Sequence, residues 1–385
     1  MPASSKNSPF LLIFIDSFPF EILASTNYLS RFPTKKRMLP GFGYSKNILP
    51  ELFAGKRPDD LGYFNEWGLG SMPSRPSSRS LSQAMVQPLH SLVFLDSAIH
   101  RAIRTVTHRY LNIPFHLYSH FVRHNASVYD GSLDTVFSLL PGLRLLLAEQ
   151  QATAPGQRDR LVLATASATL RDNPCLYLSL VDLDCFAHRH GIHSPEHSAH
   201  VKYLDASIAH LVDAYRAQTD GRGKVFVFSD HGMAQVKEGV ALSIEKELGP
   251  AGPSTYLYFV DSTMLRVWVF RQEWQARVES YLSSLNVGTI IPPLDRKKYG
   301  ITLADTGDVF FVLNEGYVFA PSFQRYRMDA AMHGYHPGLR SQHGIFLSPD
   351  PPDGVETIAS LEAHRVFETL APRSSTEERA VQQAS

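Results

Sequence analysis

The sequence has no excess of charge of either sign, few cysteines and no long apolar run. Its 385 residues contain 37 Lys+Arg and 37 Asp+Glu, which argues against nucleic acid or an anionic membrane surface as the main partner, because both attract an excess of cations. Two cysteines, Cys175 and Cys185, cannot form a disulfide framework and indicate a reducing compartment, so we expect a cytoplasmic protein. No segment reaches the roughly 18 consecutive apolar residues of a membrane span.

Hydrophobic residues and histidine are plentiful by contrast. Hydrophobic residues make up 44% of the chain and aromatics 11%, which predicts a globular protein with a large core rather than a disordered one. There are 17 histidines beside only two cysteines. Imidazole and carboxylate are therefore the available metal ligands, and this donor set suits zinc and similar ions.

Short apolar runs and one amphipathic stretch predict an α/β fold. Residues 198–217 place apolar side chains on one face and predict a helix that covers a sheet. Residues 133–150 are interpreted as a helical pair, or as a helix broken at Pro141. Four runs are predicted to be interior strands of a mostly parallel sheet: Phe10–Ile15, Leu176–Val181, Lys224–Phe228 and Gly344–Leu347.

Acidic residues follow three of these predicted strands. Asp16 follows the first, Asp182 and Asp184 the second, and Asp230 the third. Because ligands of open parallel sheets bind outside the carboxyl ends of the strands, these acids are expected to meet at one edge. The alternative is that each aspartate only caps a helix or turn.

Histidines accompany these acids at spacings that favour metal binding. Asp184 and His188 lie four residues apart, on one face of a helical turn. Asp230 and His231 are adjacent and precede a glycine, and His333 is a further candidate, with His336 and His343 as competitors. Six N/O ligands suit two metal ions better than one: Asp16, Asp184, His188, Asp230, His231 and His333.

Ser45 is the candidate nucleophile. It precedes a hydrophobic helical stretch that ends at Gly55, and a hydroxyl at a helix N-terminus lies in the positive end of the helix dipole, where a phosphate is stabilised. The alternative is an ordinary helix N-cap.

These segments, in this order, resemble the alkaline phosphatase superfamily and, within it, the type I phosphodiesterase/nucleotide pyrophosphatase family. The resemblance extends from Asp16 to Leu347 and is most specific in SDHGM, HGY and the D-x-x-x-H-x-x-G spacing. It implies an α/β fold, namely an alkaline-phosphatase-like three-layer α/β/α sandwich with a mostly parallel central sheet and inserted cap segments. The length then fits a single catalytic domain over residues 1–371. Poor periodicity at about 63–160 and mixed strand and helix patterns at about 237–325 indicate insertions, and the polar stretch at 372–385 indicates a flexible tail.

The resemblance further implies the roles of the site residues. Ser45, ten residues before Gly55, takes the position of the family nucleophile. One metal ion is expected on Asp184, His188 and His333. The second is expected on Asp16, Asp230, His231 and the Ser45 oxygen, and both ions are expected to be zinc.

Departures from the family pattern concern the phosphate pocket. Ile48 stands where family members commonly have asparagine, and Asn47 is one residue earlier. His336 stands where Asp or Asn often follows HGY. The candidate substrate-binding residues are Asn47, Tyr63, Asn65, Trp67 and His336, although the aromatic ones are equally consistent with a core position.

The expected activity is hydrolysis of a phosphodiester or pyrophosphate bond through a phosphoseryl intermediate at a two-metal site. The expected partner is a small phosphorylated molecule such as a nucleotide or nucleotide-sugar. Alternatives on the same site are a phosphomonoesterase, a phosphonate hydrolase or a phosphomutase; a sulfatase is disfavoured, because Ser45-Lys46-Asn47 lacks the sulfatase pattern. A non-catalytic phosphate-binding homologue is the remaining alternative.

Overall fold

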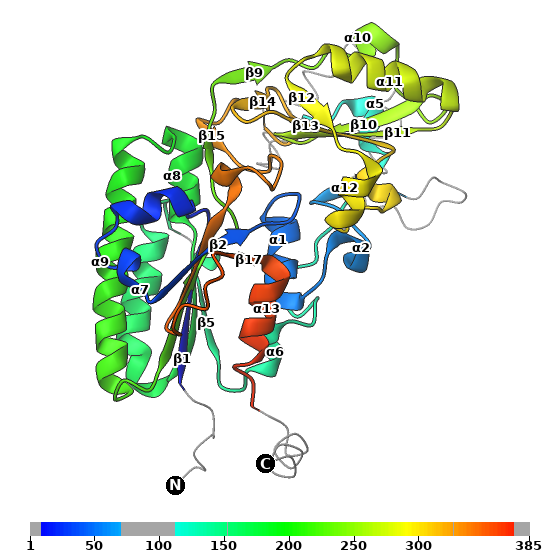
Figure 1. The fold of residues 1–385 in the computed structure, drawn as a ribbon. Helices are drawn as coiled ribbons and strands as arrows, with labels where there is room; N and C mark the ends of the chain where they lie inside the picture. Colours follow the sequence, from blue (N-terminus) through cyan, green and yellow to red (C-terminus); the bar gives the residue numbers. More distant parts are fainter. Residues whose placement is uncertain (1–8, 71–111, 152, 326, 373–385) are drawn as a thin grey trace.

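The computed structural model describes residues 9–70, 112–151, 153–325 and 327–372 (Figure 1). In this part of the chain a seven-stranded sheet has the order β17-β2-β16-β7-β1-β6-β5. β5, β6, β1 and β7 run parallel, whereas β16 is antiparallel to both β7 and β2. The strands are β1 (Phe10–Ile15), β2 (Thr34–Leu39), β5 (Arg144–Leu147), β6 (Cys175–Leu180), β7 (Lys224–Phe228), β16 (Gly344–Ser348) and β17 (Thr357–Ala359).

All four predicted strands are present as β1, β6, β7 and β16, with boundaries within one residue. The helical interpretation of residues 133–150 is wrong in its second half. Helix α6 (Val136–Leu139) is short, and β5 then pairs with β6 at the edge of the sheet. Leu146 and Leu147 pack into the cores on opposite faces, so a leucine run with no clear period serves as a two-sided strand.

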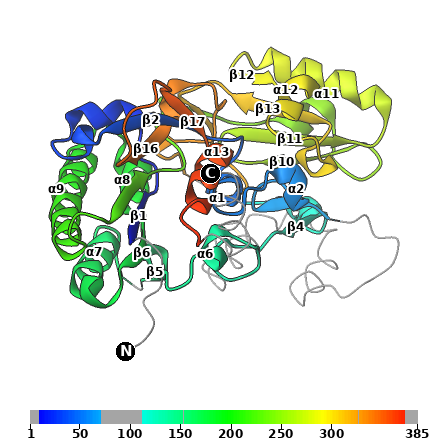
Figure 2. The same ribbon diagram turned by 60° about the horizontal axis from the view of Figure 1, so that its bottom comes forward.

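Helices cover both faces of the central sheet (Figures 1 and 2). Alternate residues of β1 point to opposite sides: Leu11, Ile13 and Ile15 join one core and Phe10, Leu12 and Phe14 the other. The first core includes residues of α7 (Arg158–Thr169) and α9 (Pro195–Gln218), and the second residues of α1 (Ser45–Ala54), α6 and α13 (Ser360–Glu368). The result is a three-layer α/β/α sandwich, as expected.

Helix α9 begins before the predicted start. Pro195 occupies its first position, and the Ser194 hydroxyl accepts a hydrogen bond from His197 N at 3.1 Å. The serine N-cap accepts a hydrogen bond from a backbone N–H of the first turn, and proline at the first position has no N–H that needs a partner. The sequence prediction began at Ser198 because it followed the apolar face alone.

A second, antiparallel sheet with the order β10-β11-β13-β12 lies within the expected insertion at 237–325. Figure 1 shows it across one end of the central layers, with α10 and α11 beside it. Its elements are β10 (Tyr256–Val260), β11 (Met264–Val269), β12 (Gly288–Ile290), β13 (Val309–Leu313), α10 (Ile244–Leu248), α11 (Gln272–Ser284) and α12 (Pro293–Lys298).

The expected insertion at 63–160 includes β5 and the start of α7, which belong to the central layers, and its residues 71–111 lie outside the described ranges, as does the tail from 373. The remaining short elements are α2 (Pro58–Leu61), β3 (Trp67–Leu69), α5 (Phe115–Tyr118), β4 (Phe121–Arg123), α8 (Asp182–His190), β8 (Ala234–Gln235), β9 (Glu238–Val240), β14 (Tyr317–Phe319) and β15 (Ala331–Met332). Within the described ranges, no helix has the length and apolarity that crossing a membrane requires.

Candidate metal centre and nucleophile

The carboxyl ends of three neighbouring strands bring the predicted acids together. β1 lies between β6 and β7 in parallel register. Asp16 follows β1 and donates its backbone N–H to Leu180 O of β6 at 2.8 Å. Asp230 follows β7 and accepts the backbone N–H of Ser17 at 3.4 Å. The acids therefore meet at one sheet edge, where a parallel α/β fold places its ligand site.

One group of potential metal ligands consists of Asp184, His188 and His333. Their ligand atoms all lie within 4.8 Å of one another. Asp184 and His188 share one face of α8, and Asp184 Oδ1 lies 3.3 Å from His188 Nε2. His333 comes from the segment after β15, and its ring centroid lies 5.4 Å from that of His188. Both imidazoles are buried.

The second group consists of Asp16, Asp230 and His231, whose ligand atoms also lie within 4.8 Å of one another. His231 Nε2 is 3.5 Å from Asp16 Oδ1 and 3.3 Å from Asp230 Oδ2. The two groups are adjacent, because the rings of His231 and His333 stack with centroids 3.7 Å apart and planes 10° apart.

Backbone carbonyls orient two of the imidazoles. His188 Nδ1 donates to Ala331 O at 2.9 Å, and His231 Nδ1 donates to Gly232 O at 2.8 Å. A ring nitrogen bonded to a carbonyl must carry the hydrogen, so in the neutral form of each ring Nε2, which faces the site, has the lone pair. This is the arrangement by which metal-binding histidines are commonly held.

Ser45 lies beside the second group. It is the first residue of α1, and its Oγ is 3.2 Å from His231 Nε2. Gly43, with φ of +114°, forms the turn that precedes the helix, and a Cβ there would lie 2.2 Å from Asn47 Nδ2. A glycine is therefore required for α1 to begin where it presents the Ser45 hydroxyl to the Asp/His groups.

The electrostatics of the two groups favour a cation. Asp16 Oδ1, Asp184 Oδ1 and Asp230 Oδ2 are buried and accept no hydrogen bond. Burial, and then the charges of Asp230 and Asp184, raise the pKa of Asp16 well above its ordinary value. Burial and the charge of His231 lower the pKa of His333, so this imidazole stays neutral. Unsatisfied carboxylates and neutral imidazoles are the donors that a divalent zinc-like ion takes, so the residues fit such a group.

A third Asp/His group has a structural role instead. It consists of Asp159, Asp182 and His200, all buried. Asp159 accepts the backbone N–H of Val181 at 2.8 Å and the Nε2–H of His200 at 2.9 Å, and Asp182 accepts Arg158 Nε at 2.8 Å. Because these carboxylates already have donors, the group joins α7 and α9 to the start of α8. Asp182 is thus separate from the acids that converge at the sheet edge.

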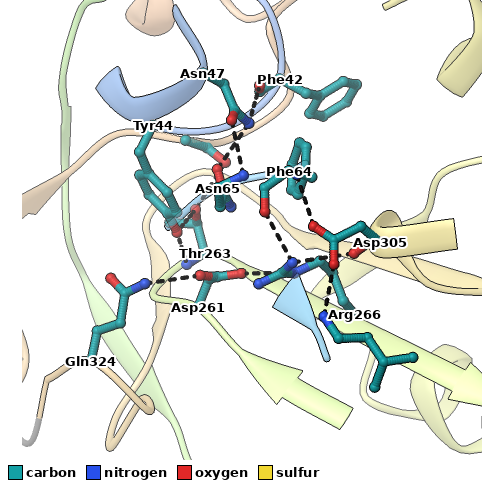
Figure 3. Close-up of polar contacts among 12 residues, drawn as sticks. Phe42, Tyr44, Asn47, Phe64, Asn65, Asp261, Thr263, Arg266, Asp305 and Gln324 are labelled. Carbon is teal, nitrogen blue, oxygen red and sulfur yellow. Dashed lines mark hydrogen bonds and ion pairs between the residues drawn. The ribbon is translucent and has the colours of Figure 1, made fainter. Parts of the chain in front are cut away.

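Two of the candidate substrate-binding residues form a buried pair. Asn47 Nδ2 donates to Asn65 Oδ1 at 2.9 Å, and Asn65 N donates to Asn47 Oδ1 at 2.9 Å (Figure 3). Asn65 has a φ of +59°, and its Nδ2 is a buried donor without a hydrogen-bond partner. A strained backbone and an unsatisfied amide are typical of a ligand-binding position.

The structure places the other three candidates in aromatic contacts. Trp67 is buried in a separate core that includes residues of the second sheet, and it stacks on Phe259 with planes 20° apart, which is the core position given above as the alternative. Tyr63 stacks on His124, with centroids 4.8 Å apart. His336 makes edge contacts with Phe42 and Tyr299.

Thr263 also supports the site, and no sequence pattern indicates it. Its hydroxyl lies 2.9 Å from the Tyr44 hydroxyl and donates to Gly334 O at 2.8 Å, while Thr263 N donates to Tyr44 Oη at 2.9 Å. The turn between β10 and β11 thereby joins the residue before Ser45 to the segment that carries His333. These partners are 219 and 71 residues away in sequence, beyond the reach of any local motif.

A fully buried arginine anchors the same turn (Figure 3). Arg266 Nε donates to Asp261 Oδ2 at 3.2 Å, and its Nη1 donates to Phe64 O at 3.2 Å. Gln324 Nε2 donates to the other Asp261 oxygen at 3.1 Å. Burial raises the pKa of Asp261 to about 6 although Arg266 opposes this. The network fixes the second sheet against the segment that contains Asn65.

Fold and site together define an alkaline-phosphatase-like α/β hydrolase. Solved structures of ectonucleotide pyrophosphatase/phosphodiesterase 5 share the fold over nearly the whole chain, each with a TM-score of 0.63. An inactive murine variant in complex with AMP is 13% identical and the human protein 15%, with 94% of both chains covered in each case. A further murine structure is 12% identical and covers 96% of this chain and 98% of its own. No curated protein matches the chain in sequence.

The sequence model of the type I phosphodiesterase/nucleotide pyrophosphatase family matches residues 90–336, more than half of the chain. The chain therefore belongs to this family and is a phosphodiester hydrolase. The matched range contains Asp184, His188, Asp230, His231 and His333. Asp16 and Ser45 precede it, and their place beside the other residues comes from the fold.

Proposed function

We propose that the chain hydrolyses a phosphodiester or pyrophosphate bond at a two-metal site, through a phosphoseryl intermediate on Ser45. One observation carries this proposal: Ser45 Oγ lies 3.2 Å from His231 Nε2, within a buried edge that holds two adjacent Asp/His groups. A hydroxyl beside two groups of cation ligands is the arrangement that covalent phosphoryl transfer requires.

The residues divide between the two ions by proximity. Asp184, His188 and His333 would hold one ion, and Asp16, Asp230 and His231, with the Ser45 oxygen, would hold the other. Aspartate and histidine donors favour Zn²⁺. Bound ions would neutralise charge on the entering and leaving oxygens of the phosphoryl group.

The chain's own residues would carry the transfer. Ser45 Oγ gives up its proton to solvent water and bonds to phosphorus, while the bond from phosphorus to the leaving oxygen breaks and that group departs with the electron pair. A water oxygen then bonds to phosphorus, the bond from phosphorus to Ser45 Oγ breaks, and a proton of that water returns to Oγ, which releases the phosphate product and restores the hydroxyl. The first turn of α1 presents backbone N–H groups and the positive end of its dipole to the phosphoryl oxygens. Asn65 Nδ2, buried without a partner and held by Asn47, would donate to one of these oxygens.

A small nucleotide or nucleotide-sugar is the proposed substrate. The murine structure with AMP supports this class. The stacked rings of Tyr63 and His124 follow the nucleophile segment, and the buried Tyr63 hydroxyl has no hydrogen-bond partner, so it would be available to a polar group of the substrate. Comparing hydrolysis of a nitrophenyl nucleoside phosphodiester with that of nitrophenyl phosphate separates a diesterase from a monoesterase.

Ser45→Ala tests the covalent scheme. We expect turnover to fall by at least about three orders of magnitude, because the attacking oxygen is removed. Zinc content should stay close to that of the wild type, because six of the seven proposed ligands remain. The measurements are hydrolysis of a nitrophenyl diester and zinc per chain by elemental analysis. Full activity in this variant would refute the phosphoseryl intermediate.

The domain organisation and the cellular location of the protein are also proposals. We propose that residues 1–371 act as one catalytic domain, since Thr263 of the second sheet contacts the nucleophile segment of the first. Both cysteines are free, which supports a cytoplasmic location. Fractionation of cells that express the tagged chain tests the location.

A further inference from the structure

A cavity lined by residues outside the two Asp/His groups adjoins α1. It has a volume of about 490 Å³ and lies between the end of β2, α1, the end of α12 and the start of α13. None of the residues that line it belongs to either metal-ligand group. Its size is in the range of cavities that bind small organic molecules.

Glu51 of α1 lines this cavity. It is 4% exposed. It lies six positions after Ser45, which places the two side chains about 120° apart around α1 and about 9 Å apart along its axis. Ser360 lies beside the carboxyl, but its hydroxyl donates to Leu39 O at 3.2 Å. Among the residues that the structure describes, Glu51 makes no ion pair, and the Ser360 hydroxyl, shared with Leu39 O, is the hydrogen-bond donor beside its carboxyl.

Gly41 leaves space for the Glu51 carboxyl. Gly41 lies against it, and a Cβ at that position would be 2.4 Å from Glu51 Oε1. An unpaired buried carboxyl costs stability, so a purely structural role would favour an apolar side chain here. Burial raises the pKa of Glu51 to about 8, with Arg57 opposing the shift.

A second buried acceptor and two cations line the same cavity. His343 donates through Nε2 to Pro337 O at 3.1 Å, and its Nδ1 has no hydrogen-bond partner. Arg57 Nη1 donates to Lys298 O at 3.1 Å, which holds both basic residues together, and the Lys298 side chain is exposed. Glu51 is the only acid among the lining residues described.

These observations indicate a ligand with hydroxyl groups at one end and an anionic group at the other. The unpartnered His343 Nδ1 and the buried Glu51 carboxyl, which has only the shared Ser360 hydroxyl beside it, fit hydroxyl groups, because a hydroxyl donates to a carboxyl in either of its protonation states. Two cations nearer the solvent require an anionic group such as a phosphate. We propose that the cavity between α1, α12 and α13 is a second binding site, separate from the metal centre, for a sugar phosphate.

Calorimetric titration of the zinc-loaded full-length protein tests this site. The probes are glucose 6-phosphate, glucose and inorganic phosphate. We expect glucose 6-phosphate to bind more tightly than either of the other two, because only it satisfies both ends of the cavity. Because the metal centre can itself bind phosphate, the comparison uses the part of the binding that Lys298→Ala removes; equal Lys298-dependent binding of inorganic phosphate, or no Lys298-dependent binding of glucose 6-phosphate, would overturn the proposal.

Variants locate the binding. Glu51→Leu removes the buried acceptor, and Lys298→Ala removes the exposed cation; each should weaken glucose 6-phosphate binding by at least about tenfold. Lys297→Ala is the matched control, because this exposed neighbour does not line the cavity. Lys298→Ala is not expected to disturb folding. An affinity and stoichiometry in Lys298→Ala equal to those of Lys297→Ala would place the binding elsewhere and refute the site.

Discussion

Asp230 and Asp159 show how differently two buried aspartates of this chain are satisfied. Asp159 accepts hydrogen bonds through both oxygens. Asp230 accepts two backbone N–H groups through Oδ1, and its buried Oδ2 accepts none. The same residue type therefore serves a helix junction in one place and keeps an unsatisfied oxygen in the other.

This contrast gives a paired prediction. Asp230→Asn should lose about one zinc ion per chain and nearly all activity, since it removes a charged ligand. Asp159→Asn should keep its zinc and lose about 1–3 kcal/mol of stability, because an amide replaces an acceptor that has donors. Elemental analysis and urea unfolding measure the two effects. Equal zinc loss in both variants would contradict the assignment.

Thr263 is expected to position the nucleophile rather than contact substrate. Thr263→Val keeps the volume but removes the hydroxyl that joins Tyr44 to the His333 segment. We expect kcat to fall by about tenfold with little change in KM, because a shift in Ser45 affects the transition state more than substrate binding. Thr263→Ser retains the hydroxyl and should restore most of kcat. If the serine variant is as slow as the valine variant, the hydroxyl has no positioning role.

Glu51 predicts a pH dependence of stability. Its pKa is raised from about 4.5 to about 8 in the folded protein, so folding keeps a proton that the unfolded chain loses. Below about pH 4.5 the Glu51 carboxyl is neutral in both the folded and the unfolded chain, and it costs no stability through ionisation. As the pH rises from about 4.5 towards 8, this group alone lowers the free energy of unfolding by about 1.4 kcal/mol per pH unit.

Glu51→Gln removes this titration. Relative to the wild type, the variant should gain stability progressively from about pH 5 to pH 8 and then no further. Melting temperatures of both proteins in a series of buffers measure the difference. A difference that stays constant across this range would show that Glu51 does not bind a proton on folding.

At the scale of elements, the sequence predicts the central strands and the acids that follow them, because apolar runs and the shared direction of parallel strands are enough to place both. β1, β6 and β7 are continuous apolar runs buried on both faces, and the acids that follow them meet because parallel strands end at one edge. The leucine run of β5 does not reveal a strand, because its position at the sheet edge depends on pairing with β6. The start of α9 is encoded locally by Ser194 and Pro195, outside the apolar periodicity of the helix.

The candidate site divides in the same way. The six Asp and His residues and Ser45 belong to short motifs at element ends, where spacing is informative. Thr263 and Arg266 act through contacts with Tyr44 and Phe64, and a contact between distant segments leaves no local period. The paired amides of Asn47 and Asn65 likewise depend on how α1 and the chain after α2 come together.

At the scale of the whole molecule, the zero net charge does not reflect the local concentration of acidic side chains at the candidate metal centre. The chain has equal numbers of acidic and basic residues, yet three carboxylates meet at the carboxyl ends of neighbouring strands, each with one buried oxygen that accepts no hydrogen bond. The β10–β11 turn contacts the segments on which Ser45 and His333 lie. Both sheets therefore contribute to an edge where bound cations would reverse the local sign and make it attractive to an anionic substrate.

Removing metal should therefore affect the stability of the entire fold as well as activity. Without ions, the charges of Asp16, Asp184 and Asp230 repel one another in a desolvated site, and the stabilisation from binding, about 4 kcal/mol at a free metal concentration a thousand times Kd, is lost. We expect a chelator to abolish hydrolysis and to lower the melting temperature by several degrees, and zinc to restore both. In Asp230→Asn the chelator should lower the melting temperature less, because one ion is already absent. A wild-type melting temperature that is unchanged by complete zinc removal would contradict a cation at this edge.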